Sequence, residues 1–383
     1  MMEGEEKAFY NIEDYEQEAT KILPPEFTMY YNFARERGWC YQDSMKAFSR
    51  YRIRARNLED VSQRSLSTTI LGEPIPYPIG VAPTAWHAAA HPQAETETAK
   101  GVAKARALFI LSMNSTSSIA EVAEATSNSL KWMQIYLCTD RLLTQHLVRE
   151  AERAGFKAIV ITVDSPRSGR DKKCYDILGR STKANSSSFC MKNFDADIPF
   201  SREAKESGDI NFNNYSSRVQ FNNKATWDDV RWMKSITSLP IVCKGILSAE
   251  SAQEAANAGA DGILVSAHGG RQMDGAPAPI DALPEVVEAV RGRGVEVYMD
   301  GGVRTGTDVF KALGRGARAV FVGRPILWGL ACKGATGVTH VLEILRTELE
   351  SVFDNSGCTR PDMIPPGMVV HKSYYHHPIQ SKI

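Results

Sequence analysis

The stretch VSAHGGRQMDG, residues 265–275, places a histidine and an arginine among glycines directly after the apolar run GILVS. A packed core strand has little use for such a mixture, and an exposed loop rarely follows so apolar an approach. Histidine exchanges a proton near neutral pH, and arginine offers a fixed cation that pairs with an anion. His268 and Arg271 are therefore the first candidates for chemistry in this chain.

A second candidate site is the stretch DGGVRTGTDVFKALGRGARAVFVGRP, residues 300–325. Gly301 and Gly302 allow a close backbone approach to a ligand, and TGTDVFKAL predicts a helix whose free N–H groups favour an anion. Gly323 and Arg324 place another glycine and a guanidinium one unit later. Packing turns and surface ion pairs explain either segment alone, but the two together predict a bound phosphate group.

Lys244 helps to decide which phosphorylated molecule binds. It lies in the apolar run PIVCKGI, where a lysine serves either as a Schiff-base nucleophile, as in an aldolase-type barrel, or as a fixed charge. A fixed cation beside the N1 and C2-carbonyl edge of a flavin stabilises the anionic reduced ring. Gln134 and Thr162, on neighbouring apolar runs, can hydrogen-bond the pyrimidine edge of that ring. An aldolase needs none of these, so the residues favour flavin mononucleotide (FMN) over a phosphorylated substrate.

Eight short apolar, β-branched runs alternate with helix-period segments and predict the elements that position these residues. This alternation indicates a parallel sheet covered by helices. Eight such units over about 260 residues match an α/β fold of the (β/α)8 TIM-barrel type, whereas a doubly wound open sheet usually has fewer strands. The predicted strands are residues 77–82, 108–112, 132–136, 158–164, 240–246, 262–266, 296–300 and 319–323.

Almost every predicted strand ends in a polar or glycine-rich cluster. In a barrel these ends converge on one face, where the loops after the strands build active sites. Any one cluster alone is explained as a strand cap or a satisfied core group, but eight in register predict a site. The clusters are Pro83–Ala85, Ser112, Gln134 with Tyr136, Thr162 with Asp164, Lys244, Ser266 with His268 and Arg271, Asp300–Arg304, and Gly323 with Arg324.

The remaining residues are predicted to complete a single domain that spans residues 1–383. Residues 1–70 lack the strand–helix rhythm, and the stretches 12–23 and 25–38 predict a helical cover. The barrel is expected over 77–345, followed by a C-terminal helix and tail over 346–383. The long polar segment 169–226 after the fourth strand is expected to be a functional lid or a mobile insertion.

Composition narrows the classes of partner and the compartment. Lys+Arg and Asp+Glu balance at 45 each, so no net field attracts nucleic acid, and no apolar run approaches the ~20 residues that cross a membrane. The seven cysteines include no C-x-x-C pair and predict free thiols in a reducing compartment, with no metal site. The tail Ser381-Lys382-Ile383 differs from the peroxisomal address S-K-L by one residue, and it predicts recognition by the peroxisomal import receptor rather than a cytoplasmic location.

Nearly the whole chain resembles the FMN-dependent L-2-hydroxyacid oxidases, the glycolate oxidase and hydroxyacid oxidase group. The resemblance implies oxidation of a 2-hydroxy acid to the 2-oxo acid, with O2 reduced to H2O2. It also implies FMN as the cofactor and a homotetramer. The motifs that carry the resemblance are, in order, APTA, LSMNSTSSIAEVAEA, QIY, ITVDSPRSGR, LPIVCKGIL, HGGRQMDG and the glycine-rich stretch 300–325.

The resemblance further implies a role for each candidate residue. His268 accepts the substrate proton, Asp164 holds the resulting imidazolium, and Arg271 pairs with the substrate carboxylate. Tyr30 and Tyr136 contact the substrate. The flavin ring and ribityl chain are surrounded by Pro83, Thr84, Ala85, Ser112, Gln134, Thr162, Lys244 and Ser266. The phosphate end is held by Asp300, Gly301, Gly302, Val303, Arg304, Gly323 and Arg324.

Four departures from the family pattern lie on the substrate side. Asp171 stands where the family usually has a second carboxylate-binding arginine. Asn114 replaces a tryptophan, Ala267 replaces an asparagine, and the segment Tyr30-Tyr31-Asn32-Phe33-Ala34 lacks the family's glycine. These changes leave three functions open: an oxidase with altered substrate preference, an FMN-binding protein with weak or lost catalysis, and a dehydrogenase that uses another electron acceptor.

Overall fold

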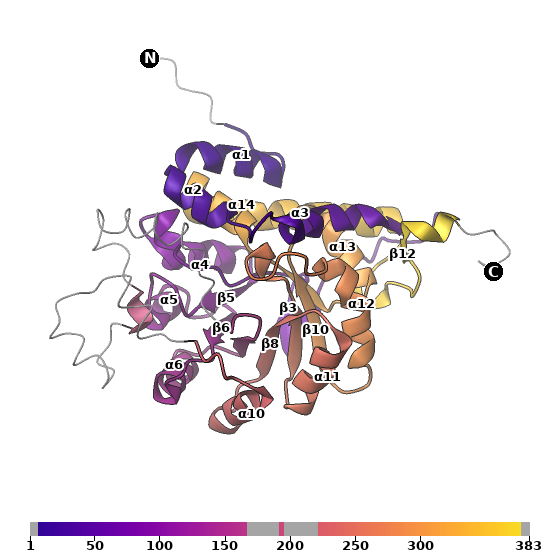
Figure 1. The fold of residues 1–383 in the computed structure, drawn as a ribbon. Helices are drawn as coiled ribbons and strands as arrows, with labels where there is room; N and C mark the ends of the chain where they lie inside the picture. Colours follow the sequence, from indigo (N-terminus) through magenta and orange to yellow (C-terminus); the bar gives the residue numbers. More distant parts are fainter. Residues whose placement is uncertain (1–6, 167–190, 195–220, 377–383) are drawn as a thin grey trace, which may run out of the picture.

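A closed barrel of eight parallel strands forms the centre of the computed structural model, which describes residues 7–166, 191–194 and 221–376 (Figure 1). The strands follow chain order around the barrel, and the last strand pairs with the first. All eight predicted strands are present, with small differences at their ends, so the TIM-barrel prediction is confirmed. The strands are β4 (Ile79–Val81), β5 (Leu108–Ser112), β6 (Lys131–Tyr136), β7 (Ile159–Thr162), β8 (Ile241–Ile246), β9 (Gly262–Val265), β10 (Glu296–Asp300) and β11 (Ala319–Val322).

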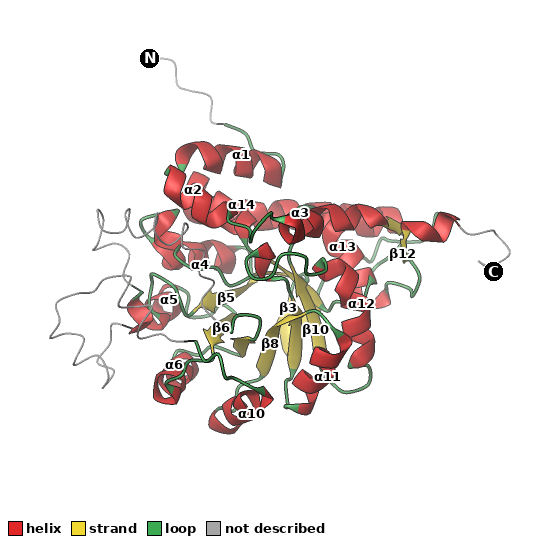
Figure 2. Ribbon diagram, in the orientation of Figure 1, coloured by secondary structure: helices red, strands yellow, loops and turns green. Residues whose placement is uncertain are grey.

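Amphipathic helices surround the barrel and bury their apolar faces against it (Figure 2). Capping residues in the sequence mark where several of these helices begin. Ser118 and Thr305, for example, each accept a hydrogen bond from the third helical amide and complete a capping box with the acidic residue there. The helices are α4 (Ala94–Lys104), α5 (Ile119–Ala125), α6 (Arg141–Arg153), α10 (Trp227–Ile236), α11 (Ala249–Asn257), α12 (Pro279–Ala289), α13 (Gly306–Gly314) and α14 (Arg324–Ser356).

The amino-terminal end of the barrel is filled by large side chains. Trp132, Tyr298 and Phe321 pack against one another in its interior, with ring centroids 5.6–5.9 Å apart. The hairpin of β2 (Thr68–Ile70) and β3 (Glu73–Ile75) adds Ile70 and Ile75 to the same apolar cluster. Since this end is closed by packing, ligands must approach at the opposite end, where the strands finish.

The N-terminal residues form α1 (Ile12–Ile22), which packs against α14, and α2 (Pro25–Asn32) and α3 (Trp39–Lys46), which lie nearer to the loops at that opposite end (Figure 1). The helical cover is only partly as predicted, because the second helix ends at Asn32 instead of continuing to residue 38. The first 70 residues also contain two short strands. One of them, β1 (Tyr51–Ile53), pairs antiparallel with β12 (Val369–His371), so the two ends of the chain are joined in one small sheet.

The boundary expected between the barrel and the C-terminal helix, at residues 345 and 346, falls inside α14. This helix is kinked at Lys333 and Gly334. Gly334 has φ 56° and ψ −139°, a conformation that suits a residue without a side chain. The remaining short 3-10 turns are η1 (Ala47–Arg50), η2 (His87–Ala89), η3 (Lys192–Phe194), η5 (His268–Gly270), η6 (Pro361–Met363) and η7 (Lys372–His376).

Some predictions fall on residues that the structure does not describe. Most of the segment 169–226, including Asp171, and the tail Ser381–Ile383 lie outside the described residues. In the described ranges, no helix combines the length and the apolar character that a bilayer crossing requires.

Candidate active site at the carboxyl ends of the barrel strands

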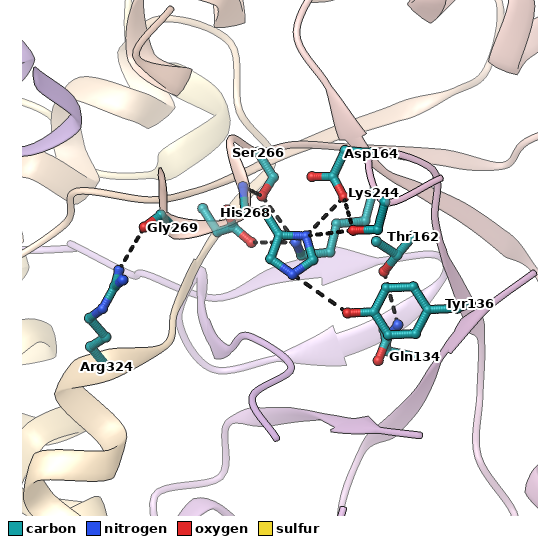
Figure 3. Close-up of polar contacts among 11 residues, drawn as sticks. Gln134, Tyr136, Thr162, Asp164, Lys244, Ser266, His268, Gly269 and Arg324 are labelled. Atoms are coloured by element: carbon teal, nitrogen blue, oxygen red, sulfur yellow. Dashed lines mark hydrogen bonds and ion pairs between the residues drawn. The ribbon is translucent and has the colours of Figure 1, made fainter. Parts of the chain in front are cut away.

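His268 and Asp164 form the most direct pair of reactive groups in the described residues. The His268 Nδ1 lies 2.8 Å from Asp164 Oδ1, and both side chains are largely buried (Figure 3). Burial opposes the charge on Asp164, but the His268 ring, Lys244 and the Ser165 hydroxyl outweigh it and hold the pKa of this carboxyl below its ordinary value. A carboxylate at Nδ1 keeps the proton there, so Nε2 is left as the basic nitrogen.

The backbone around His268 is held in an unusual conformation. His268, Gly269 and Gly270 have φ of 54°, 64° and 73°, so three consecutive residues are left-handed. A non-glycine residue in this region costs about 1–3 kcal/mol, and such strain is typical of functional sites. The His268 N–H donates to Ser266 Oγ at 3.0 Å, which helps to hold the turn. The turn directs the ring towards Tyr136, whose hydroxyl lies 3.5 Å from His268 Nε2 (Figure 3).

A row of buried polar side chains crosses the strand ends next to this pair. The Ser112 hydroxyl donates to Gln134 Oε1 at 3.1 Å, and Gln134 Nε2 donates to Thr162 Oγ1 at 2.9 Å. Lys244 continues the row on β8. Its ammonium donates to Ser266 Oγ at 3.1 Å and lies 3.8 Å from Asp300 Oδ2. The predicted residues of β5 to β10 therefore meet on one face of the barrel.

Arg271 lies against the N-terminal cover. One guanidinium nitrogen donates to the Tyr30 carbonyl at 2.8 Å, and the guanidinium carbon lies 4.8 Å from the centre of the Tyr30 ring and 5.4 Å from that of Phe33. The Tyr30 ring in turn stacks on Trp86 at 4.8 Å. Arg271 is thus oriented by two aromatic rings and a carbonyl, while its other N–H groups have no hydrogen-bond partner in the described part of the chain.

The N-terminus of α13 does not offer the free N–H groups that the sequence predicted. The Gly306 amide donates to Glu348 Oε2 at 2.7 Å, and the Asp308 amide donates to Thr305 Oγ1 at 3.2 Å. The amides of Arg304 and Thr305 both donate to the Asp308 carboxylate at 3.1 Å. The expectation of an open anion site at this helix is therefore wrong, because carboxylates of the protein already occupy the position.

Gly302 also differs from its predicted use as a close approach to a ligand. A Cβ at this position would lie 2.0 Å from the Ser44 carbonyl oxygen, so the glycine allows α3 of the cover to approach. Arg304, one position beyond Val303, extends over the Trp328 ring at 4.9 Å. Gly323 lies beside Thr84, since a Cβ on Gly323 would be 3.4 Å from the Thr84 methyl. The loops after β10, β11 and β4 are thus neighbours, as predicted.

The guanidinium of Arg324, predicted to bind the phosphate, is hydrogen-bonded to backbone carbonyls of the protein. Its three nitrogens donate to the carbonyls of Tyr31, Gly269 and Phe33, at 2.8, 3.0 and 2.9 Å. Figure 3 shows the contact with Gly269, next to His268. Arg324 therefore joins the base-bearing turn to the N-terminal cover.

Three residues near the site were not predicted from the sequence: Ser165, Gln272 and His87. Ser165 donates to Asp164 Oδ1 at 3.1 Å and accepts from Gln272 Nε2 at 2.6 Å, which extends the histidine–aspartate pair. Their positions beside Asp164 and Arg271 in the sequence were the available signal. His87 is fully buried between the hydroxyls of Thr84 and Thr98, at 2.6 and 2.7 Å, and no short motif indicates this.

The other predicted residues and the departures from the family pattern are also placed. Pro83 and Ala85 are partly buried in the loop after β4, and Val303 is buried after β10. Asn114 follows β5, and its backbone N–H donates to Ser112 Oγ at 3.2 Å. Ala267 is buried against Cys40 and Ala276.

Within the described residues, no three or more His, Cys, Asp or Glu side chains lie together in a group that could hold a metal ion. The five cysteines found there, Cys40, Cys138, Cys243, Cys332 and Cys358, are free thiols, as predicted. The other two, Cys174 and Cys190, lie outside the described ranges.

The fold and the site define a class of flavoprotein oxidoreductase. Residues 19–371 match the family model of the FMN-dependent dehydrogenases, and the chain belongs to this family, whose cofactor is FMN. It is 44% identical to human 2-hydroxyacid oxidase 1 over 94% of this chain and 95% of that one. It is also 44% identical to a peroxisomal (S)-2-hydroxyacid oxidase of Arabidopsis thaliana, over 92% of this chain and 94% of the relative.

Solved structures show the same similarity in three dimensions. A lactate oxidase of Pediococcus acidilactici is 34% identical, with a TM-score of 0.81 and coverage of 94% of both chains. A mandelate oxidase variant with (S)-mandelic acid is 33% identical, with a TM-score of 0.81 over 93% of this chain and 97% of that one. The similarity covers both the barrel and the cover.

The residues present fit FMN. A flavin ring needs hydrogen-bonding partners along one polar edge and a positive charge for its reduced form, and the buried row of Gln134, Thr162 and Lys244 provides both types of group. Lys244 is 4% exposed, and within the described residues its partners are the Ser266 hydroxyl and Asp300. A buried cation at the strand ends suits a ligand that carries negative charge.

Proposed function

We propose that the protein oxidises an L-2-hydroxy acid to the 2-oxo acid and passes both electrons, through FMN, to O2 to form H2O2. The observation that carries the proposal is the position of His268, which is 2.8 Å from Asp164, faces Tyr136 and lies on the same turn as Arg271. The relatives named 2-hydroxyacid oxidase, at 44% identity over almost the whole chain, support the same reaction.

The base step follows from the His268 geometry. Nδ1 carries a proton towards Asp164, so Nε2 accepts the proton that the hydroxy acid loses on oxidation. The imidazolium that forms is stabilised by the buried Asp164 carboxylate, as a charge-assisted hydrogen bond. Both hydride transfer and proton abstraction from carbon use this same base.

The carboxylate of the substrate is proposed to pair with Arg271. A planar guanidinium binds a carboxylate through two parallel hydrogen bonds, and the contacts with Tyr30 and Phe33 fix its plane before substrate arrives. Tyr136 and Tyr30 are proposed to contact the substrate beside it. Since Asp171 replaces the family's second arginine, Arg271 carries more of the binding energy in this chain than in relatives that have both.

FMN, when bound, supplies the two-electron acceptor. Lys244 is the buried cation proposed to hold the negative charge of the reduced cofactor, and Gln134, Thr162, Ser112 and Ser266 are proposed to hydrogen-bond it. Pro83, Thr84 and Ala85 are proposed to pack against it. The phosphate end is assigned to the loops after β10 and β11, residues 300–304 and 323–324.

The experiment is a peroxide assay on purified, FMN-loaded protein with a panel of short, long and aromatic L-2-hydroxy acids. We expect flavin bleaching without oxygen and stoichiometric H2O2 with oxygen for at least one acid, and loss of both in His268→Ala. Bound FMN with no bleaching by any acid favours an FMN-binding protein without catalysis. Bleaching with dye reduction but no oxygen consumption favours a dehydrogenase.

We further propose that the chain is one domain, that it assembles as a homotetramer, and that Ser381-Lys382-Ile383 directs it to peroxisomes. Support for the compartment comes from relatives named as peroxisomal enzymes and from the similarity of the tail to S-K-L. Fluorescently tagged protein in cells should lose its peroxisomal pattern when the three residues are deleted. Light scattering of the pure protein measures the oligomer.

A further inference from the structure

The partly buried side chain of Arg324 makes more contacts with the N-terminal cover than with its own loop. Nε donates to the Tyr31 carbonyl and one terminal nitrogen donates to the Phe33 carbonyl, while the guanidinium lies 4.5 Å from the Tyr41 ring centre. The other terminal nitrogen donates to Gly269. An arginine is suited to such a position because its donors diverge in a fixed plane.

These contacts fall on the end of α2, where the last helix carbonyls have few partners within the helix and only the Tyr30 carbonyl, among the three, accepts from a backbone N–H in the described residues, that of Phe33 at 3.3 Å. Arg271 donates to the Tyr30 carbonyl, and Arg324 donates to those of Tyr31 and Phe33. Two cations are thus brought to the negative end of one helix dipole. Burial and the nearby charge of Arg271 lower the pKa of Arg324, so the carbonyls and the Tyr41 ring offset a real cost.

The same guanidinium holds the turn that carries the base. The Gly269 carbonyl lies in the left-handed segment between His268 and Arg271, and the hydrogen bond from Arg324 is 3.0 Å. The fit is tight, because a Cβ on Gly269 would lie 2.8 Å from the Arg324 nitrogen. The turn is strained and needs external contacts to persist.

We propose that Arg324 is a positioning residue whose side chain locks the His268–Arg271 turn to the end of α2, so that the base and the carboxylate anchor are held against Tyr30. This inference rests on the proposed function. In this inference the Arg324 guanidinium orders the substrate-binding residues, and the phosphate of FMN is bound by the backbone of the loops and by Arg304.

The two roles of Arg324 predict different measurements. If the side chain positions the turn, its loss lowers kcat and weakens binding of a carboxylate ligand, with little change in FMN affinity. If the side chain holds the phosphate, its loss weakens FMN affinity first. Arg304→Gln serves as the comparison, because that arginine contacts Val303 and Trp328 and reaches no residue of the 268–271 turn.

The experiment compares wild type with Arg324→Lys, Arg324→Gln and Arg304→Gln. FMN affinity is measured on apoprotein by quenching of flavin fluorescence, oxalate affinity on FMN-loaded protein by the flavin absorbance change, and turnover by peroxide formation. For both Arg324 variants we expect FMN affinity within about threefold of wild type and at least tenfold weaker oxalate binding and kcat/KM. FMN binding weakened tenfold or more, with oxalate affinity of the fully loaded variant unchanged, overturns the inference.

Two glycine variants test the same contact without removing the arginine. Gly269→Ala places a methyl against Arg324, whereas Gly275→Ala has the same left-handed backbone in the same loop, with φ 83° and no atom within 4 Å. Gly269→Ala should weaken oxalate binding and speed trypsin cleavage after Lys21 on the cover, and Gly275→Ala should do neither. Equal effects of the two alanines would show that backbone strain alone is responsible, and would overturn the role of Arg324.

Oxalate binding and trypsin cleavage do not depend on turnover. If wild type forms no peroxide with any acid, the proposed function fails while these two measurements still decide the role of Arg324.

Discussion

Replacing Asp164 with asparagine keeps the shape of the side chain and removes its charge. Asp164 Oδ1 accepts from His268 Nδ1 at 2.8 Å and from the Ser165 hydroxyl at 3.1 Å, whereas Oδ2 is buried with no hydrogen-bond partner. Oδ2 faces Gly245, whose missing Cβ would lie 2.7 Å from it. If the asparagine amide nitrogen takes the place of Oδ2, it is a buried donor without an acceptor. If it takes the place of Oδ1, it donates to His268 Nδ1 and reverses the tautomer of the ring.

The size of the effect follows from the lost charge-assisted hydrogen bond. Such a bond contributes about 1.5–3 kcal/mol, which corresponds to a loss of roughly 10- to 150-fold in kcat/KM. The Asp164 carboxylate also stabilises the imidazolium that forms when His268 accepts the substrate proton. Its removal should therefore lower kcat as well as kcat/KM, because the charge that develops on the ring loses its buried partner.

The assay is kcat/KM for peroxide formation from the best substrate between pH 5 and 9. Asp229→Asn is the control, since Asp229 is a buried aspartate of α10 that pairs with Arg141 away from the strand ends. An Asp164→Asn enzyme with kcat/KM within threefold of wild type throughout this range would refute the assignment of Asp164 as the partner of the base.

Three further perturbations have defined outcomes. Burial lowers the pKa of His87, so below about pH 6.5 the unfolded chain binds a proton that the native protein excludes. The free energy of unfolding should therefore fall as pH decreases, by up to about 1.4 kcal/mol per pH unit. Urea unfolding between pH 5 and 7.5 should show this slope in wild type and not in His87→Gln. Lys244→Met removes the buried cation proposed to hold reduced FMN, and should make the two-electron flavin potential roughly 30–60 mV more negative in a dye-equilibration titration, given that 30 mV is about 1.4 kcal/mol. Gly302→Ala puts a methyl 2.0 Å from the Ser44 carbonyl oxygen, whereas Gly294→Ala, with φ 72°, has open space around it. Calorimetry should show that Gly302→Ala lowers the free energy of unfolding by about 1–3 kcal/mol more than Gly294→Ala, in which only the backbone is strained.

The barrel could be predicted from the sequence because its signal is local. Each strand is a short run of apolar, β-branched residues, and its polar end follows within one or two positions. His268, Asp164 and Lys244 were found as strand-end residues for this reason, and the structure brings them to one face. Their chemical types then restrict what that face can do.

The errors arose where a distant segment decides the structure. The second helix was extended to residue 38, but Arg271 and Arg324 bind the carbonyls of residues 30–33 and the chain turns there. The Gly306 amide, expected to be open at the start of α13, donates to Glu348, which is more than forty positions further along the chain. Neither contact leaves a periodic trace in the local sequence, so no window of neighbouring residues contains it.

The pairing of β1 with β12 has a consequence for how the protein is made. Tyr51–Ile53 cannot find their partners, Val369–His371, until almost the entire chain has left the ribosome. The contacts of α1 with α14 are delayed in the same way, although α1 is synthesised first. We therefore expect the nascent barrel to bind flavin before the cover settles over it, and the order of synthesis to leave the strand ends open during loading. A ribosome-bound chain stalled before residue 369 should retain FMN-binding ability and still lack affinity for oxalate.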